Sequence, residues 1–218
     1  MKLCHHPNII RLIDHLENND YIYIVSEYIE GGTLYDYFKL KKNDFKEKEA
    51  ANIIRQIAYG IFYLHSYGIV HKDLKPTNIM ITEQSDSGIV KIGDFGVSKI
   101  ISPNECIIET SGTLKYMAPE VVLCRPHGME IDIWSMGVIL YLMIFGVYPF
   151  DGENKKQIEN SILKKKLWIP HPYFEASSKE LDDLIEKCLE KPPEDRITIE
   201  ELVCHPWFKI NEEPEKSP

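Results

Sequence analysis

The spacing of apolar residues changes along the chain from a strand pattern to a helix pattern. Residues 9–16 and 21–28 are rich in aromatic and β-branched side chains, and a polar turn at 17–20 separates them. This arrangement predicts two strands joined as a hairpin. Three shorter apolar runs bounded by Gly, Pro, Asp and Ser predict further small strands, at 69–70, 79–81 and 90–92.

Helical periodicity dominates the remainder of the chain. Apolar residues recur every three or four positions from 45 to 67, which predicts a long helix, and a short helix is expected at 33–38. After Pro119 the periodic segments are interrupted by prolines and predict four more helices, at 132–145, 154–165, 178–189 and 198–203. Residues 97–115 have no clear period and predict a long loop. The whole pattern is typical of an α-rich domain preceded by a fragment of sheet.

One segment, 133–150, contains no charged residue and is near the minimum length of a membrane-spanning helix. Gly146 and Pro149 interrupt it, and both flanks are acidic rather than basic. A helix that is apolar on all sides also suits the centre of a large domain. We therefore expect a buried helix and no membrane partner.

Composition narrows the class of protein further. The chain has 218 residues, is 44% hydrophobic and carries a formal net charge of −9, which argues against wholesale disorder and against a broad nucleic-acid-binding surface. Its five cysteines include no C-x-x-C pair and are too sparse for a disulfide framework. Free thiols in a reducing compartment are the simplest interpretation, so we expect a cytoplasmic protein.

Three short motifs follow one another in the second quarter and the middle of the chain. Residues 71–78 have the sequence HKDLKPTN; Asp-Phe-Gly begins at Asp94, 21 residues after Asp73, and Ala-Pro-Glu begins at Ala118. Together they resemble the catalytic loop, metal-binding motif and activation-segment end of the eukaryotic protein kinases. A chance match of all three in this order is negligible, and the resemblance extends over residues 1–208.

The chemistry of phosphoryl transfer fits these residue types. A carboxylate at Asp73 can accept the proton of an attacking hydroxyl, and Lys75 can supply a positive charge to the transferring phosphate. Asn78 and Asp94 offer hard oxygen ligands for Mg²⁺. The alternative is that these are polar residues that cap turns. It explains each residue singly but does not explain why all of them occur together.

The resemblance implies an α+β fold of the protein-kinase type, with a complete, mainly helical C-lobe and a remnant of the N-lobe β-sheet. The expected division is an N-lobe remnant at 1–26, a hinge region at 27–33, the C-lobe at 34–208 and a frayed tail at 209–218.

The resemblance also assigns substrates and further site residues. The Lys-Pro sequence at 75–76 is similar to that of serine/threonine kinases, and Thr113 resembles the threonine that supports the catalytic aspartate. The implied catalytic residues are Asp73, Lys75, Asn78 and Thr113. ATP is the implied phosphoryl donor, with Mg²⁺ as cofactor, and the implied nucleotide-binding residues are Glu27, Ile29, Lys75, Asn78, Met80 and Asp94. The expected partner is a protein with a Ser or Thr acceptor.

Other positions resemble structural parts of the family. Asp132 resembles the aspartate that holds the catalytic loop, and Glu120 and Arg196 resemble a buried ion pair. Residues 114–120 and the His-Pro-Trp-Phe sequence at 205–208 are similar to those of calcium/calmodulin-regulated and calcium-dependent kinases. This similarity leaves room for a regulatory domain or protein outside the chain.

Two departures from the family pattern qualify these expectations. Lys72 stands where the family usually has an arginine that binds a phosphorylated activation loop, which predicts a weaker dependence on loop phosphorylation. The Gly-rich loop and the strand lysine are absent from the sequence, and Met1 aligns with a core position of a helix. We therefore expect an N-terminally truncated kinase domain with little activity alone. Two explanations stay open: part of an active enzyme, or a pseudokinase-like binding module.

Overall fold

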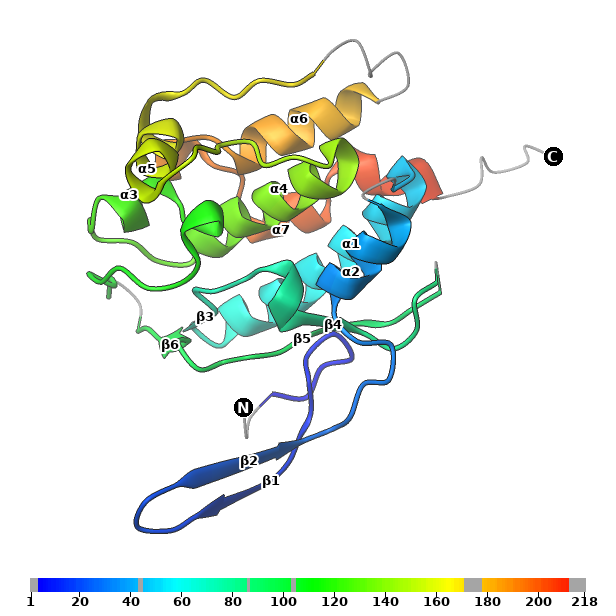
Figure 1. The fold of residues 1–218 in the computed structure, drawn as a ribbon, viewed down its shortest axis with the longest axis vertical. Coiled ribbons are helices and arrows are strands. Elements are labelled where there is room, and N and C mark those ends of the chain that lie inside the picture. Colours follow the sequence, from blue (N-terminus) through cyan, green and yellow to red (C-terminus); the bar gives the residue numbers. More distant parts are fainter. Residues whose placement is uncertain (1–3, 43–44, 86, 103–104, 171–177, 212–218) are drawn as a thin grey trace, which may run out of the picture.

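Helices are the main regular structure of the computed structural model, which describes residues 4–42, 45–85, 87–102, 105–170 and 178–211. The α-helices of the described residues are α1 (Leu34–Lys41), α2 (Glu47–Ser66), α3 (Pro119–Val122), α4 (Glu130–Phe145), α5 (Lys155–Lys164), α6 (Lys179–Cys188) and α7 (Ile199–Val203). Short 3₁₀ helices are η1 (Pro76–Asn78), η2 (Leu114–Tyr116), η4 (Pro193–Asp195) and η5 (Pro206–Asn211). The expected α+β class is confirmed, and the helices gather in one body (Figure 1).

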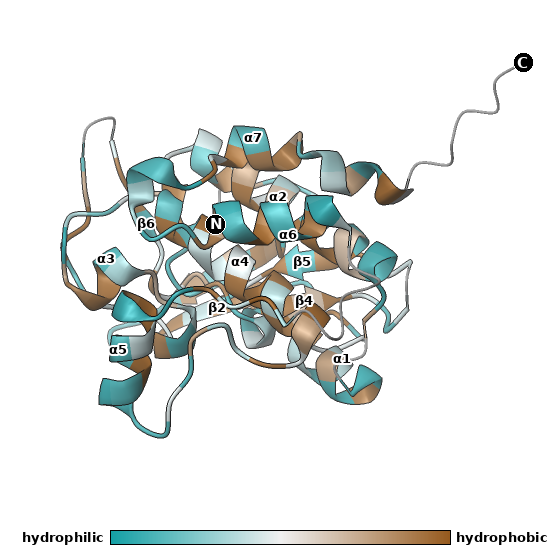
Figure 2. Ribbon diagram, turned by 90° about the horizontal axis from the view of Figure 1, so that it is seen from above, coloured by the Kyte–Doolittle hydropathy of each residue, from teal (hydrophilic) through white to brown (hydrophobic). Residues whose placement is uncertain are grey.

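Helix α4 forms the centre of this body. Residues Ile131–Met143 are all buried, and the helix ends at Gly146, which adopts the left-handed conformation (φ 69°) that favours glycine. The long amphipathic helix α2 packs against α4, α7 and η5. In Figure 2, α6 and α7 carry both teal and brown segments, as expected for helices with one face against a core.

The apolar segment in α4 is therefore a buried helix, as predicted. None of the helices in the described ranges combines the length and apolarity needed to cross a membrane.

Two antiparallel strands, β1 (Leu12–Glu17) and β2 (Ile22–Ser26), form a hairpin that projects from the helical body (Figure 1). The predicted first strand begins too early. Ile9 instead forms an isolated bridge with Ile92, and the Ile10 N–H donates to the Ile92 carbonyl (2.9 Å). Both isoleucines are buried against the helical body. The apolar run that predicted a single strand therefore covers two segments, the buried residues 9–10 and the hairpin strand β1.

Two further sheets lie against the helical body. Strands β4 (Ile79–Ile81) and β5 (Val90–Ile92) pair antiparallel, and β3 (Ile69–Val70) pairs with β6 (Lys99–Ile100). The β4–β5 pairing brings the start of one strand beside the end of the other, so the Gly93 N–H donates to the Asn78 carbonyl (2.8 Å). This contact positions η1 next to the residues that follow β5.

Several element boundaries differ from the prediction. The segment 97–115 contains β6 and the first two residues of η2, and both elements are too short to produce a periodic pattern. Helix α1 begins at Leu34, because Thr33 is its N-cap and forms a capping box with Asp36. It runs three residues past the predicted end, to the point where Lys42 closes its C-terminus in a left-handed conformation. Residues 209–211, assigned to the tail, belong to η5. The rest of that tail and Met1 lie outside the described residues, and the lobe boundaries remain a prediction.

Candidate active site

The buried carboxylate of Asp132 on α4 binds the backbone of the loop between β3 and η1. Its Oδ2 accepts hydrogen bonds from the His71 N–H (2.9 Å) and from Nε2 of His65 (2.9 Å), and its Oδ1 accepts one from the Lys72 N–H (3.0 Å). Burial acts to raise the pKa of Asp132, but the His65 hydrogen bond and the other donors outweigh it and lower the pKa. The anion therefore fixes the backbone immediately before Asp73.

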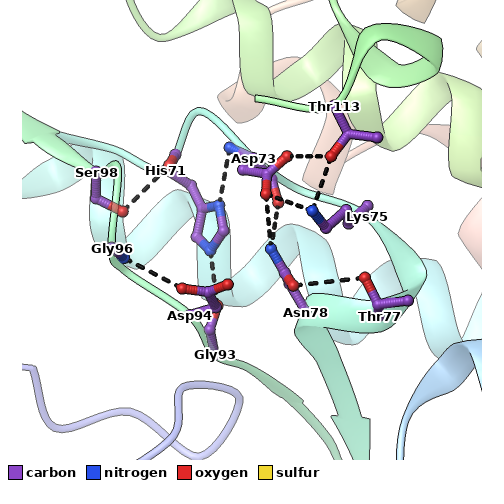
Figure 3. Close-up of polar contacts among 10 residues, drawn as sticks. All are labelled: His71, Asp73, Lys75, Thr77, Asn78, Gly93, Asp94, Gly96, Ser98 and Thr113. Carbon is purple, nitrogen blue, oxygen red and sulfur yellow. Dashed lines mark hydrogen bonds and ion pairs between the residues drawn. The ribbon is translucent and has the colours of Figure 1, made fainter. Parts of the chain in front are cut away.

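All four predicted catalytic side chains meet at the end of this loop (Figure 3). The Thr113 hydroxyl donates to Oδ1 of Asp73 (2.8 Å) and accepts from Nζ of Lys75 (2.7 Å). Lys75 Nζ also donates to Oδ2 of Asp73 (2.6 Å), and Nδ2 of Asn78 donates to the same oxygen (3.1 Å). The structure thus joins residues from the catalytic loop, η1 and the activation segment into one polar network.

This network keeps the Asp73 carboxylate ionised. Partial burial acts to raise its pKa, but hydrogen bonds from Lys75, Thr113 and Asn78, together with the positive charge of Lys75, lower the pKa overall. The carboxylate is consequently an acceptor whose direction is fixed by three side chains.

The two predicted metal ligands lie on either side of the contact between η1 and the end of β5. Nδ2 of Asn78 donates to the carbonyl oxygen and to Oδ2 of Asp73. The amide is therefore oriented with its Oδ1 away from the Asp73 carboxylate. Asp94 adopts a left-handed conformation (φ 54°), uncommon for a residue other than glycine, and its Oδ1 accepts from the Gly96 N–H (3.3 Å). The described residues contain no cluster of three or more His, Cys, Asp or Glu side chains that would enclose a metal. This donor set fits Mg²⁺ that is shared with phosphate oxygens and water.

A cavity of about 580 Å³ lies between the β1–β2 hairpin and the helical body. Its lining includes Met80, Asp94, Phe95 and Ser26, so two of the predicted nucleotide-binding residues meet there. The Glu27 carboxylate points elsewhere, because Lys91 Nζ (2.8 Å) and the Arg11 N–H (2.7 Å) bind it. Ile29 is not in the lining of this cavity.

Comparison with known proteins assigns this arrangement to a family. A family model described as the protein kinase domain matches residues 1–208. The chain belongs to the protein kinase family. The catalytic-loop, Asp-Phe-Gly and Ala-Pro-Glu motifs all lie within the matched residues, and membership of the family agrees with the resemblance seen in the sequence.

Curated relatives are serine/threonine kinases. The chain is 37% identical over 97% of its length to a probable myosin light chain kinase of Dictyostelium discoideum, and 39% identical over 93% to serine/threonine-protein kinase 17A of Oryctolagus cuniculus. It is 40% identical over 95% of its length to calcium-dependent protein kinase 29 of Arabidopsis thaliana. The chain covers 54%, 51% and 39% of these three proteins, so it spans between two-fifths and about half of their length.

The kinase activation segment is tied to the late helices by a buried ion pair. Arg196 Nη1 donates to Oε1 of Glu120 (2.7 Å) and Nη2 donates to Oε2 (3.2 Å), and Nη1 also donates to the Glu130 carbonyl (2.9 Å). This bidentate pair confirms the predicted contact between Glu120 and Arg196.

Three contacts of this kinase site were not found by sequence reasoning. They are the His65–Asp132 hydrogen bond, the Lys91–Glu27 ion pair and the Lys72–Glu109 ion pair. The partners in each pair are 37 to 67 residues apart, and no sequence motif contains both partners of a pair. The available signal was the residue type alone: a His on the apolar face of a helix, a Lys in a short strand and a Glu in a presumed loop.

Proposed function

We propose that this chain is the catalytic part of a protein serine/threonine kinase, which transfers the γ-phosphoryl group of ATP to a Ser or Thr hydroxyl of a protein. The observation that carries the proposal is the joint contact of Asp73 with Lys75 and Thr113, which fixes a carboxylate and a cation at one point. A retired site has no need to keep this arrangement, which favours catalysis over a pseudokinase-like binding module.

In the proposed reaction, Asp73 orients the substrate hydroxyl and accepts its proton. The hydroxyl oxygen forms a bond to the γ-phosphorus while the bond from that phosphorus to the bridging oxygen breaks, and ADP leaves with the electron pair. Lys75 offsets negative charge on the transferring group, since its Nζ lies 2.6 Å from the Asp73 carboxylate. Proton acceptance by a positioned carboxylate typically contributes about 10²–10⁴-fold to the rate.

The nucleotide is proposed to lie over Met80, in the cavity between hairpin and helical body. The Glu27 carboxylate is occupied by Lys91 and the Glu27 N–H donates to the Arg11 carbonyl (3.0 Å), so the Glu27 carbonyl and the backbone at Ile29 are the groups proposed to meet an adenine edge. Asn78 and Asp94 would hold Mg²⁺, which would neutralise negative charge on the phosphates. Kinases of this family generally use ATP and Mg²⁺, and this chain supplies the matching side chains.

The proposed partners are proteins with an exposed Ser or Thr. Curated relatives include calcium-dependent and calcium/calmodulin-dependent kinases by name, which supports a regulatory domain or protein outside this chain. A cytoplasmic location is proposed from the acidic composition and the free cysteines.

The experiment is a transfer assay with the full-length protein, γ-labelled ATP, Mg²⁺ and a library of peptides with a single Ser, Thr or Tyr acceptor. We expect label on Ser and Thr peptides and none on Tyr peptides. The Asp73→Asn variant should lose transfer by about 10²–10⁴-fold, because the amide cannot accept the hydroxyl proton.

Asp14→Asn is the matched control, since Asp14 is exposed on the β1–β2 hairpin. It should transfer at the wild-type rate. Transfer that persists in Asp73→Asn, or wild-type protein that binds Mg-ATP without transfer to any peptide, would contradict the proposal.

A further inference from the structure

Lys72 is a buried lysine with a constrained backbone. Its side chain is only 4% exposed, its N–H is held by Asp132, and its backbone is left-handed (φ 72°). An ammonium group removed from water is strongly destabilising unless a carboxylate pairs with it. The position of Lys72, next to Asp73, therefore requires an acidic partner close to the catalytic loop.

Glu109 of the activation segment is that partner. Lys72 Nζ donates to Oε1 of Glu109, whose side chain is 47% exposed. The Lys72 hydrogen bond and its charge lower the pKa of Glu109, and the nearby Lys99 and His127 add to this effect. Glu109 is thus an anion near three basic side chains, and the buried Lys72 binds it directly.

The ion pair is one of two contacts that close a short stretch of the activation segment onto the catalytic loop. At one end Glu109 binds Lys72; at the other Thr113 binds Asp73. Between them Gly112 has φ 104°, and a Cβ there would lie 2.6 Å from the Lys72 carbonyl oxygen. The two segments therefore run in close contact from residue 109 to residue 113, so a movement of Glu109 would be passed to Thr113.

Two hydroxyl side chains lie between Glu109 and Thr113: Thr110, which is exposed, and Ser111, whose Oγ is buried. Thr110 Oγ1 donates to the Val121 carbonyl (3.3 Å), and Ser111 Oγ is buried without a hydrogen-bond partner among the described residues. A phosphate on Ser111 would require the stretch to open. The negative charge next to Lys72 is already supplied by the carboxylate of Glu109.

We propose that Glu109 is a positioning residue for the transfer reaction: its ion pair with Lys72 holds the activation segment so that Thr113 orients Asp73, without a phosphate on the segment. The inference rests on the proposed kinase function and adds how the active arrangement is maintained. It predicts a domain whose activation segment is closed as synthesised.

The experiment uses the full-length protein and compares three single variants, Glu109→Gln, Glu109→Asp and Lys72→Met. A double variant combines Glu109→Gln with Lys72→Met. Three quantities are measured: kcat, the KM for ATP, and hydrogen exchange of the amides at 107–113. Glu105→Gln is the matched control, because Glu105 lies in the same segment, is exposed and accepts a hydrogen bond from the Ser102 backbone.

We expect Glu109→Gln to lower kcat by about tenfold to a hundredfold, the effect of a lost hydrogen bond to a charged group. The KM for ATP should change less than twofold, and exchange at 107–113 should accelerate. Glu109→Asp should recover part of kcat, and Glu109→Gln should have little further effect on Lys72→Met, because the pair is already broken. Phosphatase treatment should leave wild-type kcat unchanged.

Wild-type kcat and exchange in Glu109→Gln would overturn the inference, as would a loss of wild-type activity on phosphatase treatment equal to that of Glu109→Gln. Fully additive effects of the two substitutions would also overturn it. Absence of transfer by the wild type would refute the proposed function instead, and the exchange comparison would still test the ion pair.

Discussion

At the scale of single residues, Thr113 connects the activation segment to the catalytic loop through one hydroxyl. That oxygen donates to Asp73 and accepts from Lys75. Thr113→Val removes the hydroxyl and keeps the shape, so both charged groups lose a partner. We expect kcat to fall by about tenfold to a hundredfold with little change in the KM for ATP, measured in steady-state assays.

The hydroxyl, rather than the methyl group, carries this effect if the interpretation is correct. Thr113→Ser should therefore retain kcat within a few-fold of wild type. A loss in Thr113→Ser as large as that in Thr113→Val would contradict it, because the two variants differ in the hydroxyl that the network uses.

Asp132 is a second residue whose single side chain determines local geometry. Its two oxygens accept from two backbone N–H groups and from His65. Asp132→Asn replaces one oxygen with a donor, so at least one buried N–H loses its acceptor. We expect the free energy of unfolding to fall by about 1–3 kcal/mol, measured by urea denaturation. The exposed Asp14→Asn serves as control, and an equal loss in both variants would show that burial is irrelevant.

At the scale of elements, the Arg196–Glu120 pair joins η4, α3 and α4. Both side chains are nearly inaccessible to solvent, at 0% and 4%. Removal of one partner leaves an uncompensated buried charge, so Glu120→Gln should lower the free energy of unfolding by about 3–5 kcal/mol. Guanidinium denaturation measures this loss.

A double variant separates the pair from its surroundings. Glu120→Leu combined with Arg196→Met should cost less than the two single substitutions together, because no charge remains buried. The surface pair Lys155–Glu159, with nitrogen and oxygen 3.8 Å apart, is the comparison. Glu159→Gln should change stability by about 0.5 kcal/mol or less, and a loss there similar to that of Glu120→Gln would remove the argument from burial.

Elements differ in how well the sequence predicts them, for physical reasons. Helices α2 and α4 are long, so their apolar spacing or continuous apolar composition is sufficient, whereas β6 has two residues and exists only because β3 pairs with it. The predicted catalytic side chains lie within one eight-residue motif, apart from Thr113. Thr113, like Glu109 and His65, reaches the site through the tertiary fold, and local spacing carries no information about such contacts.

At the scale of the whole molecule, ionised carboxylates link the fold to pH. The pKa values of Asp73, Asp132, Asp151 and Asp183 are all lowered in the folded chain. For the first three, burial acts to raise the pKa, but hydrogen bonds and nearby basic side chains outweigh it. For Asp183, the Lys187 hydrogen bond is the largest cause. At these positions the unfolded chain binds protons more tightly than the folded one. Their contribution to stability is present above the unfolded pKa of about 3.9 and is lost as pH falls through the lower folded values.

We therefore expect the contribution of these groups to be constant between about pH 5 and 7 and to decline below about pH 4, as measured by urea denaturation at each pH. Asp132→Asn removes one of the four titrations, so its stability should depend less steeply on pH in the acidic range than that of the wild type. Asp14→Asn should retain the wild-type slope, because Asp14 is exposed on the β1–β2 hairpin and makes no ion pair among the described contacts. A wild-type protein that gained stability between pH 5 and 3, or an Asp132→Asn variant with an unchanged slope, would show that the buried carboxylate is not ionised in the folded state.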